Sequence, residues 1–284
     1  MNTAALSAGL SLKPEHFDEA RACRASGLWL EVHPENYMVA GGPRLAWLHA
    51  LREAHPLSMH GVSLSLGSHA PPDARHLERL AALVRRFEPA LVSEHLAWCH
   101  WGDAWVPDLL PIVRSDEALR TIARNVSQAQ DALARPIAIE NPAHYLELDS
   151  HEWSEPDFLR ELARRTGCRL LLDINNVVVS AHNLRCSPQT YLDDFPFETV
   201  EEIHLAGHRP DPGLGDALWI DSHDAPVADP VWALYAQVIE RAGPRPTLIE
   251  RDAKLPAFDT LLSERDRAEA VLRAAARTQD PVTA

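Results

Sequence analysis

Eight carboxylate and imidazole side chains lie at or shortly beyond the ends of apolar, strand-like segments. They are His60, His95, Glu140, Asp173, His204, Asp221, His223 and Glu250. In an α/β barrel, strand ends from distant parts of the chain meet at one face, which normally carries the chemistry. Carboxylates mixed with imidazoles at such a face suit a cluster of divalent metal ions. The sequence therefore predicts a metalloenzyme.

The segments that would position these residues alternate regularly along the chain. Short apolar runs, several of them almost continuously hydrophobic as in strands covered on both faces, are separated by amphipathic stretches. The expected strands are 8–12, 28–32, 57–62, 90–95, 136–140, 169–173, 200–204 and 246–250. Eight such alternations predict an α/β protein with a (β/α)8 TIM barrel. We expect one catalytic domain over residues 1–275 and a loose C-terminal tail at 276–284.

Capping residues predict the ends of two helices. Ser115 precedes an acidic first turn, Ser154 opens a capping-box-like segment, and Gly167 would end the second helix. The segment after Asp173, which contains Asn175, Asn176 and His182, is expected to be a loop. A tryptophan-rich segment around 98–105 is expected to pack on itself, with a peptide-binding floor as the alternative.

Composition limits the classes of function. The 284 residues carry 27 Lys and Arg against 41 Asp and Glu, a formal net charge of -14. Because nucleic-acid-binding proteins usually show a basic surface, this charge disfavours nucleic acid as a partner. No apolar run reaches the length of a membrane span, no signal peptide is evident, and the four cysteines form no paired motif. We expect a cytoplasmic protein without a membrane partner.

Each candidate ligand has a structural alternative when it is considered alone. A single histidine is more often a hydrogen-bonded structural residue than a ligand. Glu140 and Glu250 end apolar strands, where an unpaired charge is costly, so each requires a cation or an ion-pair partner. For Glu250 the neighbouring Arg251 and Asp252 could supply that partner. The remaining histidines on expected helices or helix ends are taken as surface groups, namely His16, His49, His55, His76 and His151.

Long contiguous motifs extend the argument from single residues to a family. They are WLEVHPENYM, HGVSLSLGS, VSEHLAW, IENPAHYL, TGCRLLLDINNVVVSAHN, EEIHLAGH, IDSHDAPV and TLIERD. Together, from about Leu10 to Ala270, the chain resembles the multinuclear non-haem iron-dependent oxidative enzymes. That family includes the catalytic subunits of methanobactin and bufferin biosynthesis. The resemblance implies a TIM barrel of the xylose isomerase-like type.

The resemblance also implies a distribution of ligands among two or three iron ions of mixed ferrous and ferric state. The first ion would be held by His60, His95 and Glu140. Glu140 would bridge to a second ion, whose other ligands would be Asp173, His204 and Glu250. A third ion would be held by Asp221 and His223, completed by Asn176, His182 or both. Weaker candidates for substrate binding are His33, Asn36 and His208.

The activity implied by the resemblance is an iron- and O2-dependent oxidation of cysteine in a ribosomally synthesised precursor peptide. Products in the family include oxazolone with thioamide, thiooxazole and related groups. A small leader-binding partner protein is expected beside the Cys-containing peptide. The sequence identifies no catalytic residues beyond the metal ligands.

Two other functions remain open from the residues alone. The first is a zinc- or manganese-dependent hydrolase or isomerase on the same barrel. A sugar isomerase usually needs a catalytic lysine, and neither Lys13 nor Lys254 ends an expected strand. The second is a non-catalytic protein that binds metal or peptide.

Overall fold

Eight parallel strands close into a barrel in a computed structural model that describes residues 6–102 and 104–279. Around the barrel the hydrogen-bonded order is β1, β2, β3, β4, β7, β8, β9 and β12, which returns to β1. Their bounds are β1 Ala8–Ser11, β2 Leu30–Val32, β3 Leu57–Gly61, β4 Leu91–His95, β7 Ala138–Glu140, β8 Arg169–Asp173, β9 Val200–Leu205 and β12 Thr247–Ile249. Each expected strand overlaps one of these, so the predicted TIM barrel is confirmed.

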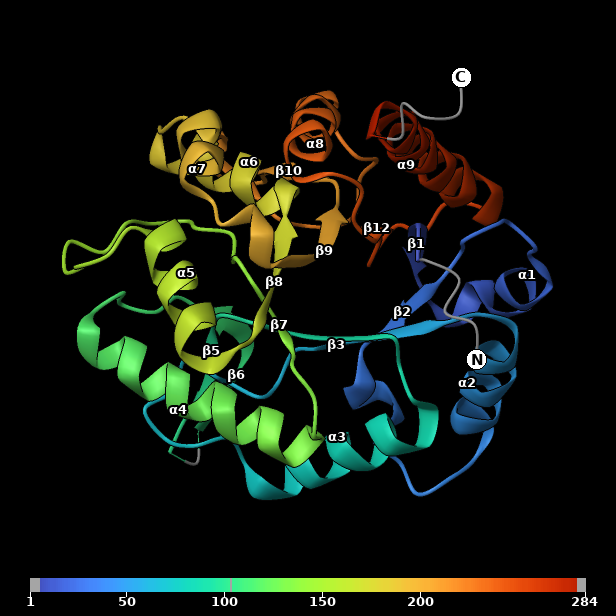
Figure 1. Ribbon diagram of the computed structural model, residues 1–284, viewed down its shortest axis with the longest axis horizontal. Coiled ribbons are helices and arrows are strands. Elements are labelled where there is room, and N and C mark those ends of the chain that lie inside the picture. Colours follow the sequence, from blue (N-terminus) through green and yellow to red (C-terminus); the bar gives the residue numbers. More distant parts are fainter. Residues whose placement is uncertain (1–5, 103, 280–284) are drawn as a thin grey trace.

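Helices surround the barrel strands (Figure 1). Their bounds are α1 Phe17–Ala22, α2 Pro43–Ala54, α3 Ala74–Phe87, α4 Asp116–Leu133, α5 Glu155–Thr166, α6 Ile174–Leu184, α7 Pro188–Asp194, α8 Asp229–Ala242 and α9 Phe258–Gln279. Three short 3-10 turns lie at Pro14–His16, Pro34–Tyr37 and Phe197–Thr199. Because α9 continues to Gln279, the first four residues of the expected tail are helical, and 280–284 lie outside the described residues. None of the described helices is long and apolar enough to span a membrane.

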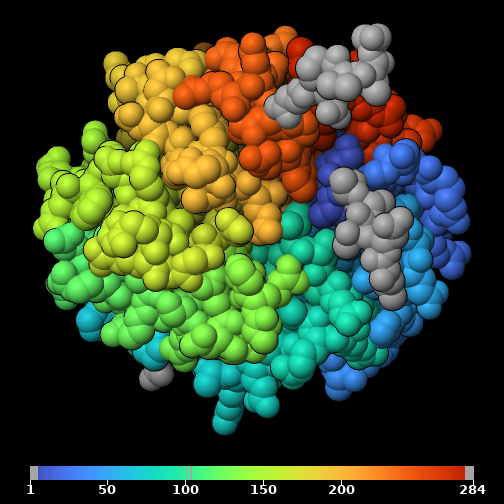
Figure 2. Space-filling view, in the orientation of Figure 1, coloured from blue at the N-terminus to red at the C-terminus, as the bar shows by residue number. Residues whose placement is uncertain are grey.

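Closure of the barrel brings the two ends of the described chain together. Strand β1 pairs in parallel with β12, with Gly9 opposite Leu248. Figure 2 shows the corresponding dark blue N-terminal segment lying against orange and red C-terminal segments. The closed sheet therefore has no free edge, and every strand contributes one end to the same face.

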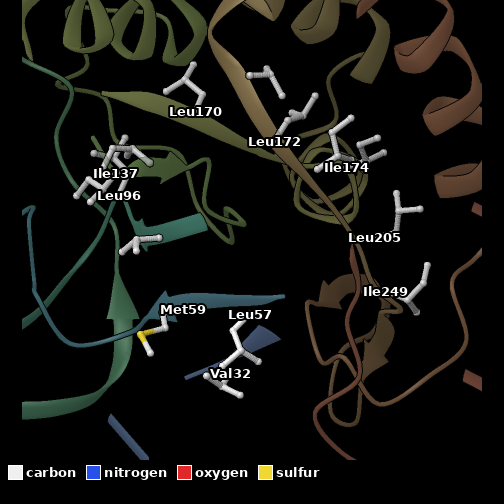
Figure 3. Close-up of a cluster of buried hydrophobic side chains, with 14 of the residues drawn as sticks. Val32, Leu57, Met59, Leu96, Ile137, Leu170, Leu172, Ile174, Leu205 and Ile249 are labelled. Atoms are coloured by element: carbon white, nitrogen blue, oxygen red, sulfur yellow. The ribbon is translucent and has the colours of Figure 1, made fainter. Parts of the chain in front are cut away.

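Alternation along each strand separates the hydrophobic core from the barrel interior. Leu170 and Leu172 of β8 belong to the large buried apolar cluster beneath the helices, which also contains Leu57 and Met59 of β3 (Figure 3). Successive side chains of a strand point to opposite faces, so Asp173 of β8 points into the barrel. The apolar cluster thereby fixes which side chains face inward.

The predicted helix caps are confirmed. The Ser115 hydroxyl accepts a hydrogen bond from the backbone N–H of Ala118, and the Ser154 hydroxyl accepts one from Asp157. Gly167 ends α5 with φ of +70°, a left-handed conformation that favours glycine.

Two expectations about local structure were wrong. The segment after Asp173 is helix α6 rather than a loop, because the Asp173 carboxylate caps its first turn by accepting a hydrogen bond from the Asn176 N–H. Its valines are buried, and this packing outweighs the modest helix propensity of β-branched residues.

His16 and His55 were expected to lie on the surface, but both side chains are buried. The Nε2 atom of His16 contacts the carbonyl of Pro256, and that of His55 contacts the carbonyl of Ala20.

Two hairpins follow barrel strands at their carboxyl ends. Strands β5 (Trp98–Trp101) and β6 (Ala104–Leu110) follow β4, and strands β10 (Arg209–Asp211) and β11 (Gly215–Ile220) follow β9. In the first hairpin, Trp98 Nε1 donates to the carbonyl of Pro111, whereas Trp105 is 63% exposed. The expected self-packing therefore holds for Trp98 and not for Trp105.

The loop that carries Asp221 and His223 packs directly on the backbone at Gly207. A Cβ atom at Gly207 would lie 2.0 Å from the Ala225 carbonyl oxygen, and the His223 N–H donates to the Gly207 carbonyl at 2.9 Å. We expect Gly207→Ala to lower the free energy of unfolding by at least about 1–3 kcal/mol, because backbone atoms cannot move aside as a flexible side chain can.

Urea unfolding of the Gly207→Ala variant would measure this loss. Gly41→Ala is the matched control, since a Cβ there meets nothing within 4 Å. Equal midpoints for Gly207→Ala and Gly41→Ala would contradict the proposed close contact.

Candidate metal centre

The ends of β3, β4 and β7 bring three predicted ligands to one point. Glu140 Oε2 lies 3.2 Å from His60 Nε2 and 3.1 Å from His95 Nε2, and the two Nε2 atoms lie 3.2 Å apart. Register explains the juxtaposition, because His95 pairs with Glu140 across β4 and β7. The three residues expected to hold the first ion are therefore adjacent.

Hydrogen bonds fix the orientation of both imidazoles. His95 Nδ1 lies 3.0 Å from the Gly61 carbonyl, which can only accept, so Nδ1 carries the proton. His60 Nδ1 lies 2.8 Å from the Ser93 hydroxyl. The Nε2 atoms of both rings consequently face Glu140, and such outer partners are typical of metal-binding histidines.

A second and a third group of donors adjoin the first. Donor atoms of Glu140, Asp173 and His204 lie within 4.8 Å of one another, as do those of Asp173, His223 and Glu250. Glu140 and Asp173 thus each belong to two groups. Such shared carboxylates allow neighbouring ions to be bridged.

Glu250 connects two of the imidazoles. Its Oε2 lies 3.4 Å from His204 Nδ1, and its Oε1 lies 3.4 Å from His223 Nδ1. His223 Nε2 in turn lies 2.7 Å from Asp221 Oδ1. Arg251 pairs with Glu264 and not with Glu250, so the Arg251 ion pair considered from the sequence is not formed.

The two alternative donors of the third site lie in different places. Asn176 Nδ2 is 3.3 Å from Glu140 Oε1, and its Oδ1 is buried without a hydrogen-bond partner. His182 Nε2 lies 2.7 Å from the Asp216 carbonyl, and its ring stacks on Trp219 at 3.7 Å. Among the described residues, the groups formed by His, Cys, Asp and Glu donors include neither His182 nor Asp221. Asn176 therefore lies beside Glu140, whereas His182 lies beside Asp216 and Trp219 of β11.

Two of the three weaker candidates, His33 and His208, contact His60 and Asn175 near these groups. His33 Nδ1 contacts the His60 carbonyl at 3.1 Å, and a donor of His33 lies near donors of Glu250 and Asp252. His208 stacks on Trp219 at 4.6 Å, with its Nδ1 2.7 Å from Asn175 Oδ1. Asn36 is exposed, and its carbonyl accepts from Arg44.

Sequence reasoning missed Glu31 and Glu202, which form a further group with His204. Both carboxylates are almost completely buried. They were missed because they lie within strands rather than at strand ends. The available signal was a charge inside an apolar run, as in LWLEV, where a strand covered on both faces offers no water to solvate it.

Mutual proximity perturbs the acid–base equilibria of these groups. Burial alone would raise the pKa of Glu140, but His95 and His60 lower it to about 2. Burial together with Asp221 and Glu140 raises the pKa of Asp173 well above its usual range. Burial and the neighbouring Glu31 raise the pKa of Glu202 to about 7.

The donor set fits a group of metal cations. The buried carboxylates of the interior are Glu31, Glu140, Asp173, Glu202 and Glu250. Within the described part of the chain, their ion pairs involve imidazoles and no Lys or Arg. Buried oxygens of Glu140, Asp173 and Glu202 also lack hydrogen-bond partners. Carboxylate oxygen with imidazole nitrogen is a donor combination that suits zinc, manganese and iron.

Comparison with known proteins identifies the family. Residues 7–273 match the model of the family described as "RiPP precursor modification enzyme MbnB/TglH/ChrH", where RiPP denotes a ribosomally synthesised and post-translationally modified peptide. The chain belongs to this family. The resemblance stated from the sequence motifs is thereby confirmed.

A sequence relative and two solved structures are similar to the chain, the first in sequence and the other two in fold. A UPF0276 protein of Caulobacter vibrioides is 57% identical over 275 residues, which cover 97% of this chain and 98% of the relative. The zinc-bound IOLI protein superimposes with a TM-score of 0.62 at 12% identity, over 95% of this chain and 99% of that one. A xylose isomerase-like TIM barrel protein from Mycobacterium smegmatis in complex with magnesium gives 0.57 at 13%, over 96% and 98%. These two structures show the fold, which confirms the xylose isomerase-like barrel in this RiPP-modifying family member.

Removal of the Glu140 carboxylate tests the candidate centre. Because Glu140 belongs to two donor groups, we expect Glu140→Ala to lose more than one ion per chain. Metal content after purification, measured by inductively coupled plasma mass spectrometry, would show the loss. Glu147→Ala removes an exposed carboxylate as the matched control. Wild-type metal content in Glu140→Ala would refute the assignment.

Proposed function

We propose that this protein is an iron- and O2-dependent enzyme that oxidatively modifies cysteine in a ribosomally synthesised precursor peptide. The observation that carries the proposal is the chain of donor groups linked through Glu140 and Asp173 in a member of the RiPP precursor modification family. Linked donor groups suit a chemistry in which a substrate thiol and a second reactant must be activated side by side.

The proposed ligands keep the distribution that the family resemblance implies. His60, His95 and Glu140 would hold the first ion. Glu140, Asp173, His204 and Glu250 would hold the second ion. Asp221, His223 and Asn176 would hold the third, with His182 outside the cluster. Bound iron, in ferrous and ferric states, would supply a binding site for a cysteine thiolate and the electrons that dioxygen chemistry requires.

The protein's own residues orient the groups that would carry this chemistry. The Gly61 carbonyl and the Ser93 hydroxyl hold two imidazoles in place before any ligand arrives. At the rim, Asp252 links Lys13 at 2.5 Å to His223 Nδ1 at 3.2 Å. Preorganised donors of this kind reduce the reorganisation that substrate positioning would otherwise require.

Substrate contacts are proposed for the exposed part of the same face. His33, Asn36 and His208 are the candidates, together with Tyr145, whose hydroxyl accepts from the Asp221 N–H and whose side chain is 43% exposed. In line with the family resemblance, we propose that a separate small partner protein presents the peptide leader, and that the reaction takes place in the cytoplasm.

A zinc- or manganese-dependent hydrolase or isomerase is the competing function, since the neighbouring structures described above contain zinc and magnesium. Metal analysis with a visible absorption spectrum separates the two. Iron with visible absorption is expected of the oxidative enzyme. A colourless, zinc-only preparation that remains fully active would overturn the iron proposal.

Co-expression with a short Cys-containing peptide encoded beside this gene, and with any small neighbouring partner, tests the activity itself. We expect a mass change in the peptide that requires iron and dioxygen. The same peptide with its cysteines replaced by serine should keep its mass, because the proposed reaction begins at the thiol. An unmodified cysteine peptide, with partner, iron and dioxygen all supplied, would favour a non-catalytic binding role.

A further inference from the structure

His204 lies between two acidic groups on opposite sides of its ring. On one side, Nδ1 is 3.4 Å from Glu250 Oε2. On the other side, Nε2 is 3.5 Å from Glu31 Oε2 and 3.6 Å from Glu202 Oε1. The ring is completely buried, so no bulk water separates it from these carboxylates.

Glu31 and Glu202 form a layer of the barrel interior beneath the metal centre. Glu202 precedes His204 by two residues on β9, so both side chains face inward with Glu202 nearer the start of the strand. Glu31 of β2 pairs in register with Ser58 of β3, which in turn precedes His60 by two residues. The two carboxylates therefore lie one layer deeper than the strand-end ligands.

Few hydrogen-bond donors or positively charged groups contact the two carboxylates of this deeper layer. The Ser58 hydroxyl donates to Glu31 Oε2 at 3.0 Å, and Glu202 Oε2 is buried without a hydrogen-bond partner. In the described ranges, the ion pairs of Glu31 and Glu202 involve His204 alone. His204 Nε2 has no hydrogen-bond partner at these distances, so it is the ring atom at which a proton would face both carboxylates.

In His204 the ring nitrogen that faces the metal centre is Nδ1, whereas in His60 and His95 it is Nε2. In those two residues Nδ1 faces an outer partner and Nε2 faces Glu140. In His204 the deeper carboxylates face Nε2, and Nδ1 faces Glu250 at the metal centre.

We propose that Glu31 and Glu202 are positioning residues that hold the Nε2–H of His204 and thereby direct its Nδ1 to the second metal ion. The inference rests on the proposed metal centre. Carboxylate partners of a ligating imidazole fix its tautomer and increase its strength as a donor, and their loss typically costs about 10–100-fold in metal affinity.

The first test is the position of a bound ion. Zinc-loaded protein, crystallised and mapped by anomalous scattering at the zinc edge, should show an ion within bonding distance of His204 Nδ1. An ion bound instead to Nε2 between Glu31 and Glu202 would overturn the proposal and make these residues ligands. Coordination through Nε2 with both carboxylates turned away would overturn it as well.

The second test is zinc affinity in solution. Glu31→Gln and Glu202→Gln should each weaken binding of one ion by about 10–100-fold while the site of His60, His95 and Glu140 stays occupied. Glu155→Gln is the matched control, because Glu155 is a buried carboxylate whose ion pairs are with His144 and Arg114 and not with a proposed ligand. Wild-type zinc affinity in both Gln variants would refute the positioning role.

These measurements are independent of peptide chemistry. An ion at His204 Nδ1 with weakened binding in the Gln variants, but no peptide oxidation, would support the inference while the proposed activity fails. Peptide modification by the wild-type protein, with unchanged metal binding in both Gln variants, would support the proposed activity and overturn the inference.

Discussion

Negative charge confined inside the barrel is the constraint on which the rest of this structure depends. Five carboxylates are buried in the interior, and the groups that face them are imidazoles rather than Lys or Arg within the described residues. A buried ion without a partner costs several kcal/mol, so such a concentration of acids is sustainable only with protons or cations. Metal ions supply the highest positive charge in the smallest volume, which makes the arrangement suitable for a cluster and unsuitable for an ordinary core.

The barrel distributes this charge in layers. At the strand ends, the order around the mouth is His60, His95, Glu140, Asp173, His204 and Glu250. Glu140, Asp173 and Glu250 each face more than one neighbour. One layer deeper, Glu31 and Glu202 face the opposite side of His204. Because alternate residues of a strand point the same way, the two-residue spacing of Glu202 and His204 places acid beneath ligand without any loop or insertion.

Surrounding elements hold the mouth in shape. Asp173 ends a barrel strand and caps α6 through the Asn176 N–H, so the carboxylate and the following amide are fixed together. The Gly207 carbonyl anchors the N–H of His223, and Gly207 itself leaves the space that the Ala225 carbonyl occupies. These contacts set donor positions through backbone geometry, which makes the site less dependent on flexible side-chain conformers than a site built on free loops.

The sequence by itself determined the barrel, because near-continuous apolar strands, amphipathic helices and their caps are encoded locally. It also indicated the candidate ligands at the strand ends, since a charge at the end of an apolar run is costly unless a cation or another polar partner lies beside it. It could not place Asn176 beside Glu140 and His182 beside Trp219, or reveal Glu31 and Glu202 beneath His204. Those outcomes depend on which residues meet across the closed sheet and which ring nitrogen faces which carboxylate. Only the tertiary structure decides them, because spatial register and side-chain orientation are set by packing between distant segments.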